Sequence, residues 1–248
     1  MNGWRHGWLR QIVLAGWLLV VLGPAIVGCA APRGPAAPPP TEVQLSTIVI
    51  DGERLARRGE AVPVRVFRQG AALAVSPGMA LLDGDRVETG PDAEVVIRYP
   101  SGTELFLRPN SGGRIGSFTE FVGELFAKIK GAFAVETTFV KAGARGTAFL
   151  VRGSASGSAT VIVFEGAVEL GSTRGEWPST VLGAGTMARA HPRAPVPTAA
   201  PPEELARTRE WVERLEGLST ASSGASAAAV IGVAALVAAL LASGGDSD

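Results

Sequence analysis

The chain has 248 residues, enough for one large domain or two small ones. Its 23 Lys and Arg residues balance its 23 Asp and Glu residues, which argues against a nucleic-acid binder that works through a strongly basic field. One Cys and two His exclude a disulfide framework within the chain and a zinc cage built from Cys and His.

The first 28 residues have the pattern of an export signal. Two arginines and no acid precede an apolar run over 11–22, which is short for a bilayer span of roughly 20 residues. The following IVGC resembles the processing site of a bacterial lipoprotein, which implies cleavage before Cys29 and lipidation of Cys29. A plain signal peptide with a chance cysteine and an uncleaved signal anchor are the alternatives. Because Ala30 is not Asp, the same resemblance favours the outer over the inner membrane.

A Pro/Ala-rich linker over 29–41 leads into a β-rich body over 42–190. The expected strands pair as hairpins: 64–67 with 72–75 around Gln69-Gly70, 93–99 with 103–107 around Pro100-Ser101-Gly102, and 160–164 with 167–170 around Glu165-Gly166. Residues 117–131 fit either a short helix or a strand. Short strands with frequent turn signals predict an all-β fold, a compact β-sandwich or roll of antiparallel strands.

Alternation is clearest in the strand expected over 93–99. Val95, Ile97 and Tyr99 fall on one face of that strand, and Val96 and Arg98 fall on the other.

Five phrases of the body resemble one family in their order and spacing. They are PGMALLDGDRVET (77–89), YPSGTEL (99–105), GELFAKIKG (123–131), ARGTAF (144–149) and FEGAVEL (164–170). Together they resemble a FecR domain, with a core match over about 62–190. The resemblance implies an extracytoplasmic all-β domain, in a family that includes periplasmic halves of sigma-factor regulators. Those regulators sense an outer-membrane transporter and transmit the signal through a transmembrane helix.

The turn residues of these phrases predict structure first. Gly84 between Asp83 and Asp85 suits a tight turn with positive φ, in which the Asp side chains accept bonds from nearby backbone N–H groups. Gly102 and Gly166 suit the tips of hairpins in the same way.

The Arg145-Gly146-Thr147 phrase leaves two interpretations open. Gly146 permits close approach of two backbones, and Arg145 then pairs with an acid inside the roll, such as Glu165 or Asp85. In the second interpretation Arg145 faces a ligand.

The only three lysines, Lys128, Lys130 and Lys141, fall within 14 residues, close in sequence to Arg145. A solvated strand face explains them without a function. The alternative is a cationic patch for an anionic envelope partner, such as a glycan, a lipid head group or an acidic protein.

Residues suited to catalysis are scarce. His6 leaves with the export signal and His191 lies in a Pro-rich segment, so no candidate base supports a nucleophilic triad. Asp83 and Asp85 are expected in a turn rather than in a glycosidase pair. No phosphate-binding or dinucleotide glycine motif occurs. We therefore expect no enzymatic activity, no cofactor and no metal site.

The C-terminal part follows a second Pro-rich linker over 191–202. Residues 203–218 are predicted to form an amphipathic helix decorated with Glu and Arg. Its apolar face comprises Leu205, Trp211, Val212, Leu215 and Leu218. Residues 225–242 form an uncharged, Ala-rich helix candidate that is just long enough to span a bilayer. A helix packed on a partner and a poorly ordered segment are the alternatives.

These observations predict a membrane-anchored lipoprotein on the periplasmic side of the bacterial envelope. We expect a non-catalytic binding or scaffold module that recognises an envelope protein or a glycan, and no nucleic acid. The alternative is a component of a transmembrane signalling system that regulates a sigma factor or a transporter. Only ten residues precede the first apolar run and six follow the last, so we expect no cytoplasmic anti-sigma domain.

Overall fold

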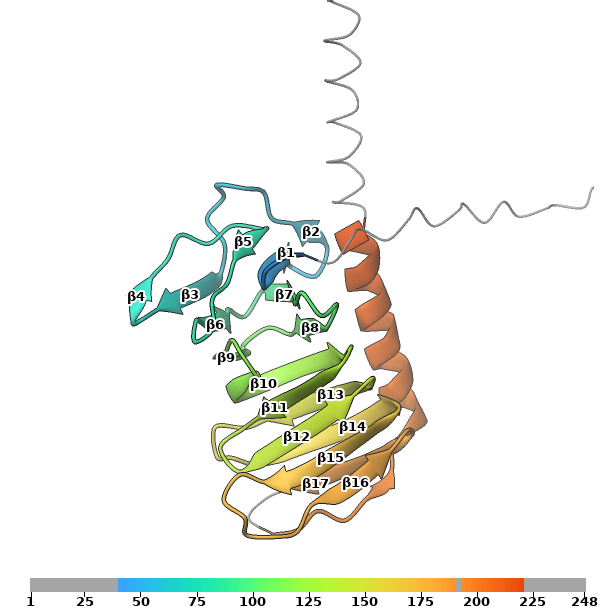
Figure 1. Cartoon of the computed structure of the whole chain (residues 1–248). Coiled ribbons are helices and arrows are strands. Elements are labelled where there is room, and N and C mark those ends of the chain that lie inside the picture. Colours follow the sequence, from blue (N-terminus) through green and yellow to red (C-terminus); the bar gives the residue numbers. More distant parts are fainter. Residues whose placement is uncertain (1–39, 191–192, 221–248) are drawn as a thin grey trace, which may run out of the picture. The chain divides into compact units, whose positions relative to one another are not determined.

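The computed structural model of the chain describes residues 40–190 and 193–220 (Figure 1). Antiparallel β-strands dominate them, and one helix covers 202–220, so the all-β prediction with a helical C-terminal segment is confirmed. Across these two ranges, no helix combines the length and the apolar character that crossing a membrane requires. The expected export signal, Cys29 and the apolar segment 225–242 lie outside the described residues.

The main sheet is a long antiparallel array. From one edge to the other it contains β18 (Thr198–Ala199), β17 (Thr186–Ala190), β14 (Ala159–Glu165), β13 (Ala148–Gly153), β10 (Thr119–Lys128), β8 (Glu104–Leu107), β7 (Ala93–Arg98), β1 (Gln44–Ile50) and β2 (Arg54–Leu55). Strand β10 lies at the middle and settles the ambiguous stretch 117–131 as a strand.

A branch and a second sheet complete the body. The branch consists of β3 (Val64–Arg68), β4 (Ala71–Ala72), β6 (Arg86–Thr89) and β9 (Gly112–Arg114), with β5 (Met79–Ala80) paired to β1. Strand β9 pairs with the first half of β10 and thereby joins the branch to the main sheet. The second sheet has four strands in the order β11 (Ala132–Glu136), β12 (Val140–Arg145), β15 (Ala167–Ser172) and β16 (Thr180–Gly183).

Both faces of the main sheet are buried, which β7 shows most clearly. Val95, Ile97 and Tyr99 join the larger hydrophobic cluster, as the alternation predicts. Val96 points the other way and joins a second cluster that the C-terminal helix covers. Two buried faces agree with the composition of β7, in which four of six residues are apolar.

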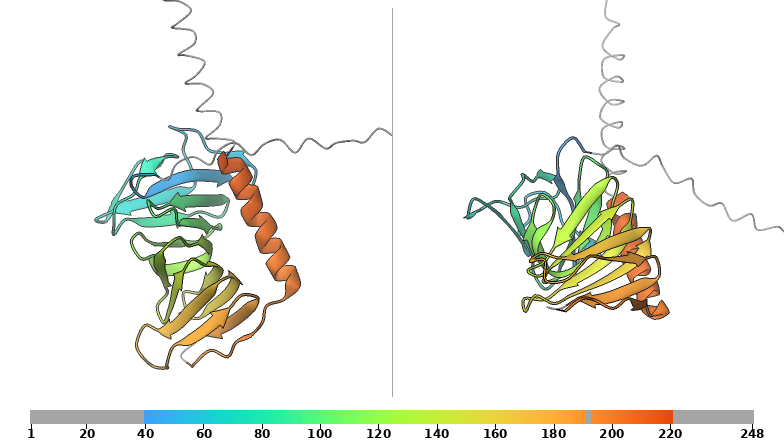
Figure 2. Two further views of the ribbon diagram at one scale, coloured as in Figure 1. Left: turned by 45° about the vertical axis from the view of Figure 1, so that its right-hand side comes forward. Right: turned by 60° about the horizontal axis from the view of Figure 1, so that its bottom comes forward.

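The helix packs along one side of the stacked strands (Figure 2). Trp211, Val212 and Leu215 are 4%, 3% and 0% exposed and pack against aromatic and aliphatic side chains of the main sheet. Leu205 and Leu218 pack at the margins of the same cluster, so all five residues of the predicted apolar face contact the sheet.

Polar contacts fix where the helix crosses the sheet. Near its beginning, Glu204 pairs with Arg152 of β13. In its middle, the Trp211 indole Nε1 donates to Glu94 of β7 at 2.8 Å. At its end, the Ser219 hydroxyl lies 2.9 Å from the Thr47 hydroxyl of β1. The helix therefore spans the main sheet from β13 to β1.

Two expectations about segments differ from the structure. Only Ala71–Ala72 is a strand where the sequence predicted one over 72–75, and the last backbone hydrogen bond to β3 there is from Leu73 N to Val66 O at 2.9 Å. The expected linker 191–202 contains edge strand β18, which pairs with β17. The chain thus returns to the main sheet immediately before the helix begins.

Candidate functional site

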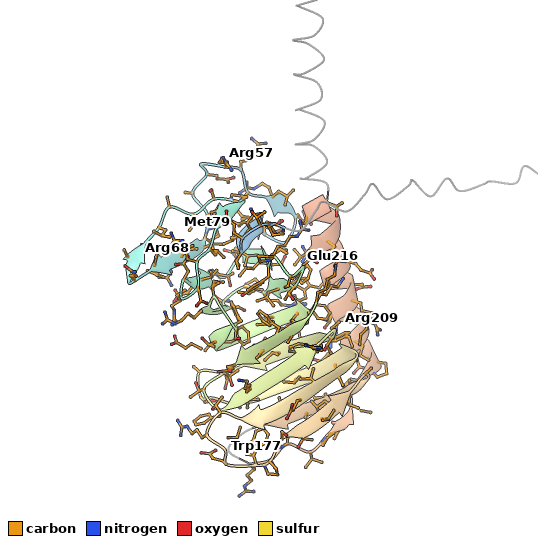
Figure 3. All side chains as sticks on the ribbon, viewed as in Figure 1. Arg57, Arg68, Met79, Trp177, Arg209 and Glu216 are labelled. Atoms are coloured by element: carbon orange, nitrogen blue, oxygen red, sulfur yellow. The ribbon has the colours of Figure 1, made fainter. Side chains whose placement is uncertain are left out.

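The structure does not gather the four cations of the sequence prediction into one patch. Lys128 lies on the helix side of β10 and pairs with Glu216, which is labelled in Figure 3. Lys130 is exposed beyond the end of β10, with its Cδ 3.0 Å from the place that a Cβ on Gly102 would take. Lys141 and Arg145 lie on β12 of the second sheet.

Lys141 and Arg145 differ in their partners. The Lys141 Nζ lies 2.8 Å from Glu136 Oε1 of the neighbouring strand. Arg145 is exposed and forms no ion pair with any residue of the described ranges. The expected pairing of Arg145 with Asp85 or Glu165 is wrong, because the alternation of β12 turns its side chain outwards.

Asp85 instead holds the tight turn to β3. Arg68 Nε and Nη2 donate to its two carboxyl oxygens at 2.9 and 2.7 Å, and Leu82 N donates at 2.9 Å. Asp85 is 1% exposed, and the hydrogen bond from Arg68 holds the pKa of its carboxyl below the usual value despite burial. Gly84 has a φ of 85°, the conformation that this turn requires.

The Arg145-Gly146-Thr147 phrase also has a structural part. A Cβ at Gly166 would lie 3.0 Å from Gly146 O, so the two hairpins approach each other closely at these glycines. Thr147 is 3% exposed, and its hydroxyl donates to Ala167 O at 3.3 Å. Gly146 and Thr147 therefore hold the connection between β12 and β13 against the start of β15. Arg145 is the residue of this phrase that faces solvent.

The solvent face of the second sheet is the surface on which Arg145 lies. We call it the outer-sheet surface and define it by Ala132, Ala134, Gly143, Arg145, Ala167, Glu169 and Val181. The strand register places Gly143 opposite Ala134 and Glu169, and places Glu169 opposite Val181. Small side chains leave a shallow hollow of about 600 Å³ here, in which one guanidinium and one carboxyl stand above alanine and glycine.

The chemistry of this surface suits binding rather than catalysis. Arg145 presents an exposed guanidinium with N–H donors only, and Val181 is 67% exposed. Within the described ranges, no three His, Cys, Asp or Glu side chains gather as a metal site would require. The sequence pattern indicated Arg145 but not this surface. Its signal is the small residues on one face of each strand, Ala132 and Ala134 in β11 and Gly143 in β12.

Comparison with known proteins supports the family resemblance. The family model described as FecR protein matches residues 85–169, a narrower range than the expected 62–190. Two crystal structures of a putative anti-sigma factor from Parabacteroides distasonis ATCC 8503 are similar at 15% identity, with TM-scores of 0.42 and 0.37. The similarity covers 49% and 52% of this chain and 62% of each of those chains. No curated protein matches. The matched range includes Asp85 and most of the outer-sheet surface, and this part of the chain therefore matches the FecR family.

Proposed function

We propose that this protein is a non-catalytic binding module on the extracytoplasmic side of a bacterial envelope membrane. In this proposal its outer-sheet surface receives an envelope protein. The observation that carries the proposal is the combination of Arg145, free of ion pairs across the described ranges, with the exposed Val181 on a sheet face of alanine and glycine. A flat face with small side chains lets the backbone of a partner approach closely, and a single guanidinium can orient an acceptor on that partner.

A protein partner fits this surface better than a glycan. Glycan sites use exposed aromatic rings as stacking platforms, whereas Phe133 at the edge of the hollow is partly buried. Its ring already makes an edge contact with Tyr99, at 5.0 Å between centroids. The remaining surface offers apolar contact and few hydrogen-bond donors.

The proposal includes anchoring through Cys29, with 225–242 as a second attachment. Its structural support is the position of the described chain ends. Strand β1 begins the body, and the Ser219 hydroxyl at the end of the helix lies 2.9 Å from Thr47 of that strand. Two attachments that leave from one end of the body would keep that end towards the membrane. A Cys29→Ser variant that is processed and fractionates like the wild type would refute the lipid anchor.

Site-specific photo-crosslinking in the producing bacterium tests the binding surface. A crosslinking residue at Val181 should give a discrete adduct, and Arg145→Glu should weaken that adduct. The matched control is Val196, an exposed valine away from the surface, with 75% exposure against 67% at Val181. Equal adducts at both positions, or none at Val181 in folded protein, would refute the surface.

A second candidate function is signal transmission through the helix. It is favoured by the FecR match and by the contacts of the helix with β13, β7 and β1. Removal of residues 221–248 leaves every one of these contacts in place. We expect this truncation to abolish a transcriptional response while the body stays folded, and an unchanged transcriptome would exclude transmission.

A further inference from the structure

Two arginines face each other directly across the branch. Arg86 of β6 is the register partner of Arg114 of β9, and their side chains are 43% and 42% exposed. Like charges at directly opposed positions of an antiparallel pair repel each other. The pair therefore needs an anion nearby, and the identity of that anion indicates what the pair can bind.

Glu120 is the anion that both arginines share, and it has an unusual backbone conformation. One of its carboxyl oxygens, Oε2, accepts from Arg114 Nη2 at 3.1 Å and from Arg86 Nη1 at 3.4 Å. Glu120 lies where the pairing of β9 with β10 shifts register, and its φ is 52°. Residues other than glycine rarely adopt this φ, and its side chain is 54% exposed. Glu120 therefore makes a long, exposed contact from strained backbone.

Each of the two arginines has a side-chain N–H group that is not used in these contacts. Arg86 Nε donates to Glu88 at 2.7 Å, and Arg114 Nη1 donates to Gly84 O at 3.0 Å. Over the described part of the chain, no protein group accepts from Arg86 Nη2 or Arg114 Nε. A guanidinium carries five N–H donors in a planar fork that matches a carboxylate.

A hollow of about 280 Å³ lies beside the pair. Its lining consists of Phe67, Gln69, Gly70, Arg86, Glu88 and Arg114. The guanidinium of Arg65 lies over the Phe67 ring, 6.0 Å from its centroid. This arginine adds a third positive charge beside the hollow, so the hollow suits the carboxyl of an acidic side chain.

We propose that Arg86 and Arg114 form a binding site for an acidic side chain of a partner polypeptide, and that Glu120 occupies this site in its absence. The partner carboxylate replaces Glu120 between the two guanidinium groups and uses their remaining donors. Glu120 then turns into solvent, which its exposure permits. The site lies on the branch, and it is independent of the outer-sheet surface and of the function proposed above.

The experiment uses the full chain and a fluorescent peptide with blocked ends and a run of glutamates. Binding is measured by anisotropy at low and at moderate salt. Glu120→Gln keeps the size of the side chain and removes the competing charge. If Glu120 occupies the site in 80–90% of molecules, this variant should bind the peptide about fivefold to tenfold more tightly. Arg114→Gln and, separately, Arg86→Gln should abolish that gain.

Two controls separate the site from general charge effects. Glu136→Gln removes another carboxylate paired with a cation, at 2.8 Å from Lys141, and should leave peptide binding unchanged. A glutamine peptide should not bind. The proposal is overturned if Glu120→Gln and Glu136→Gln tighten binding equally, or if both arginine variants keep the gain. A gain seen with a polyuronate and not with the peptide overturns the assignment to a polypeptide.

Discussion

The ion pair between Glu94 and Arg214 fastens the helix to β7, and its two members are unequally buried. The Glu94 side chain is 6% exposed and the Arg214 side chain is 37% exposed. Arg214 Nη2 donates to both carboxyl oxygens of Glu94, at 3.0 and 2.8 Å. Glu94 also accepts from the Trp211 indole at 2.8 Å. Removal of Arg214 and removal of Glu94 should therefore lower the free energy of unfolding by different amounts.

Loss of Arg214, the more exposed partner, should lower the free energy of unfolding more than loss of Glu94. Arg214→Met leaves a buried carboxylate with only an indole donor, and we expect a loss of about 3 kcal/mol in the free energy of unfolding. Glu94→Gln keeps an oxygen that accepts from the Trp211 indole. It leaves a guanidinium that water already reaches, so we expect a loss of about 1 kcal/mol.

Urea unfolding of the purified full chain, followed by circular dichroism at fixed pH and salt, measures both values. Arg207→Met is the matched control, because Arg207 is an exposed arginine of the same helix whose Nε donates only to Glu203 O. We expect the control to stay within about 0.5 kcal/mol of the wild type. A Glu94→Gln variant that loses as much stability as Arg214→Met would refute the argument from unequal burial.

Two further predictions concern the turn at Asp85 and the packing of a glycine. Because the folded state lowers the pKa of Asp85, its contribution to stability is present above the unfolded pKa of about 3.9 and is lost as the pH falls through the folded value. Urea midpoints measured from pH 7 to pH 3 should fall at the acid end, and less steeply in Arg68→Gln. A Cβ at Gly113 would lie 2.5 Å from Phe118 Cε1, so Gly113→Ala should cost about 2 kcal/mol. Gly171→Ala, with no atom within 4 Å of the added methyl group, should change stability by less than about 0.5 kcal/mol in the same titration.

Local patterns in the sequence predicted local structure well. The alternation of Val95, Val96 and Ile97 was enough to assign each side chain to one face of β7, because a strand has a strict period of two. The apolar spacing of the helix was equally informative for Trp211 and Leu215. These predictions depend only on residues that are close in the chain.

Long-range placement was beyond such patterns. Arg145 and Lys128 belong to one stretch of sequence, yet they lie in different sheets, because a tight return separates β10 from the sheet that contains β12. Strand β1 was missed because residues 44–50 have buried side chains on both faces and lack a neighbouring turn signal of hairpin type. Its partner β7 lies more than forty positions along the chain.

The C-terminal helix is part of the folded unit of this protein. The family match ends at 169, and the sequence alone placed the helix beyond a linker. In the structure, Phe106, Phe126 and Phe164 of the main sheet share one cluster with Trp211 and Leu215 of the helix. A fragment that stops before the helix would expose this aromatic face to water, at a cost of roughly 25 cal/mol for each Å². Any fragment intended for binding studies must therefore extend to residue 220.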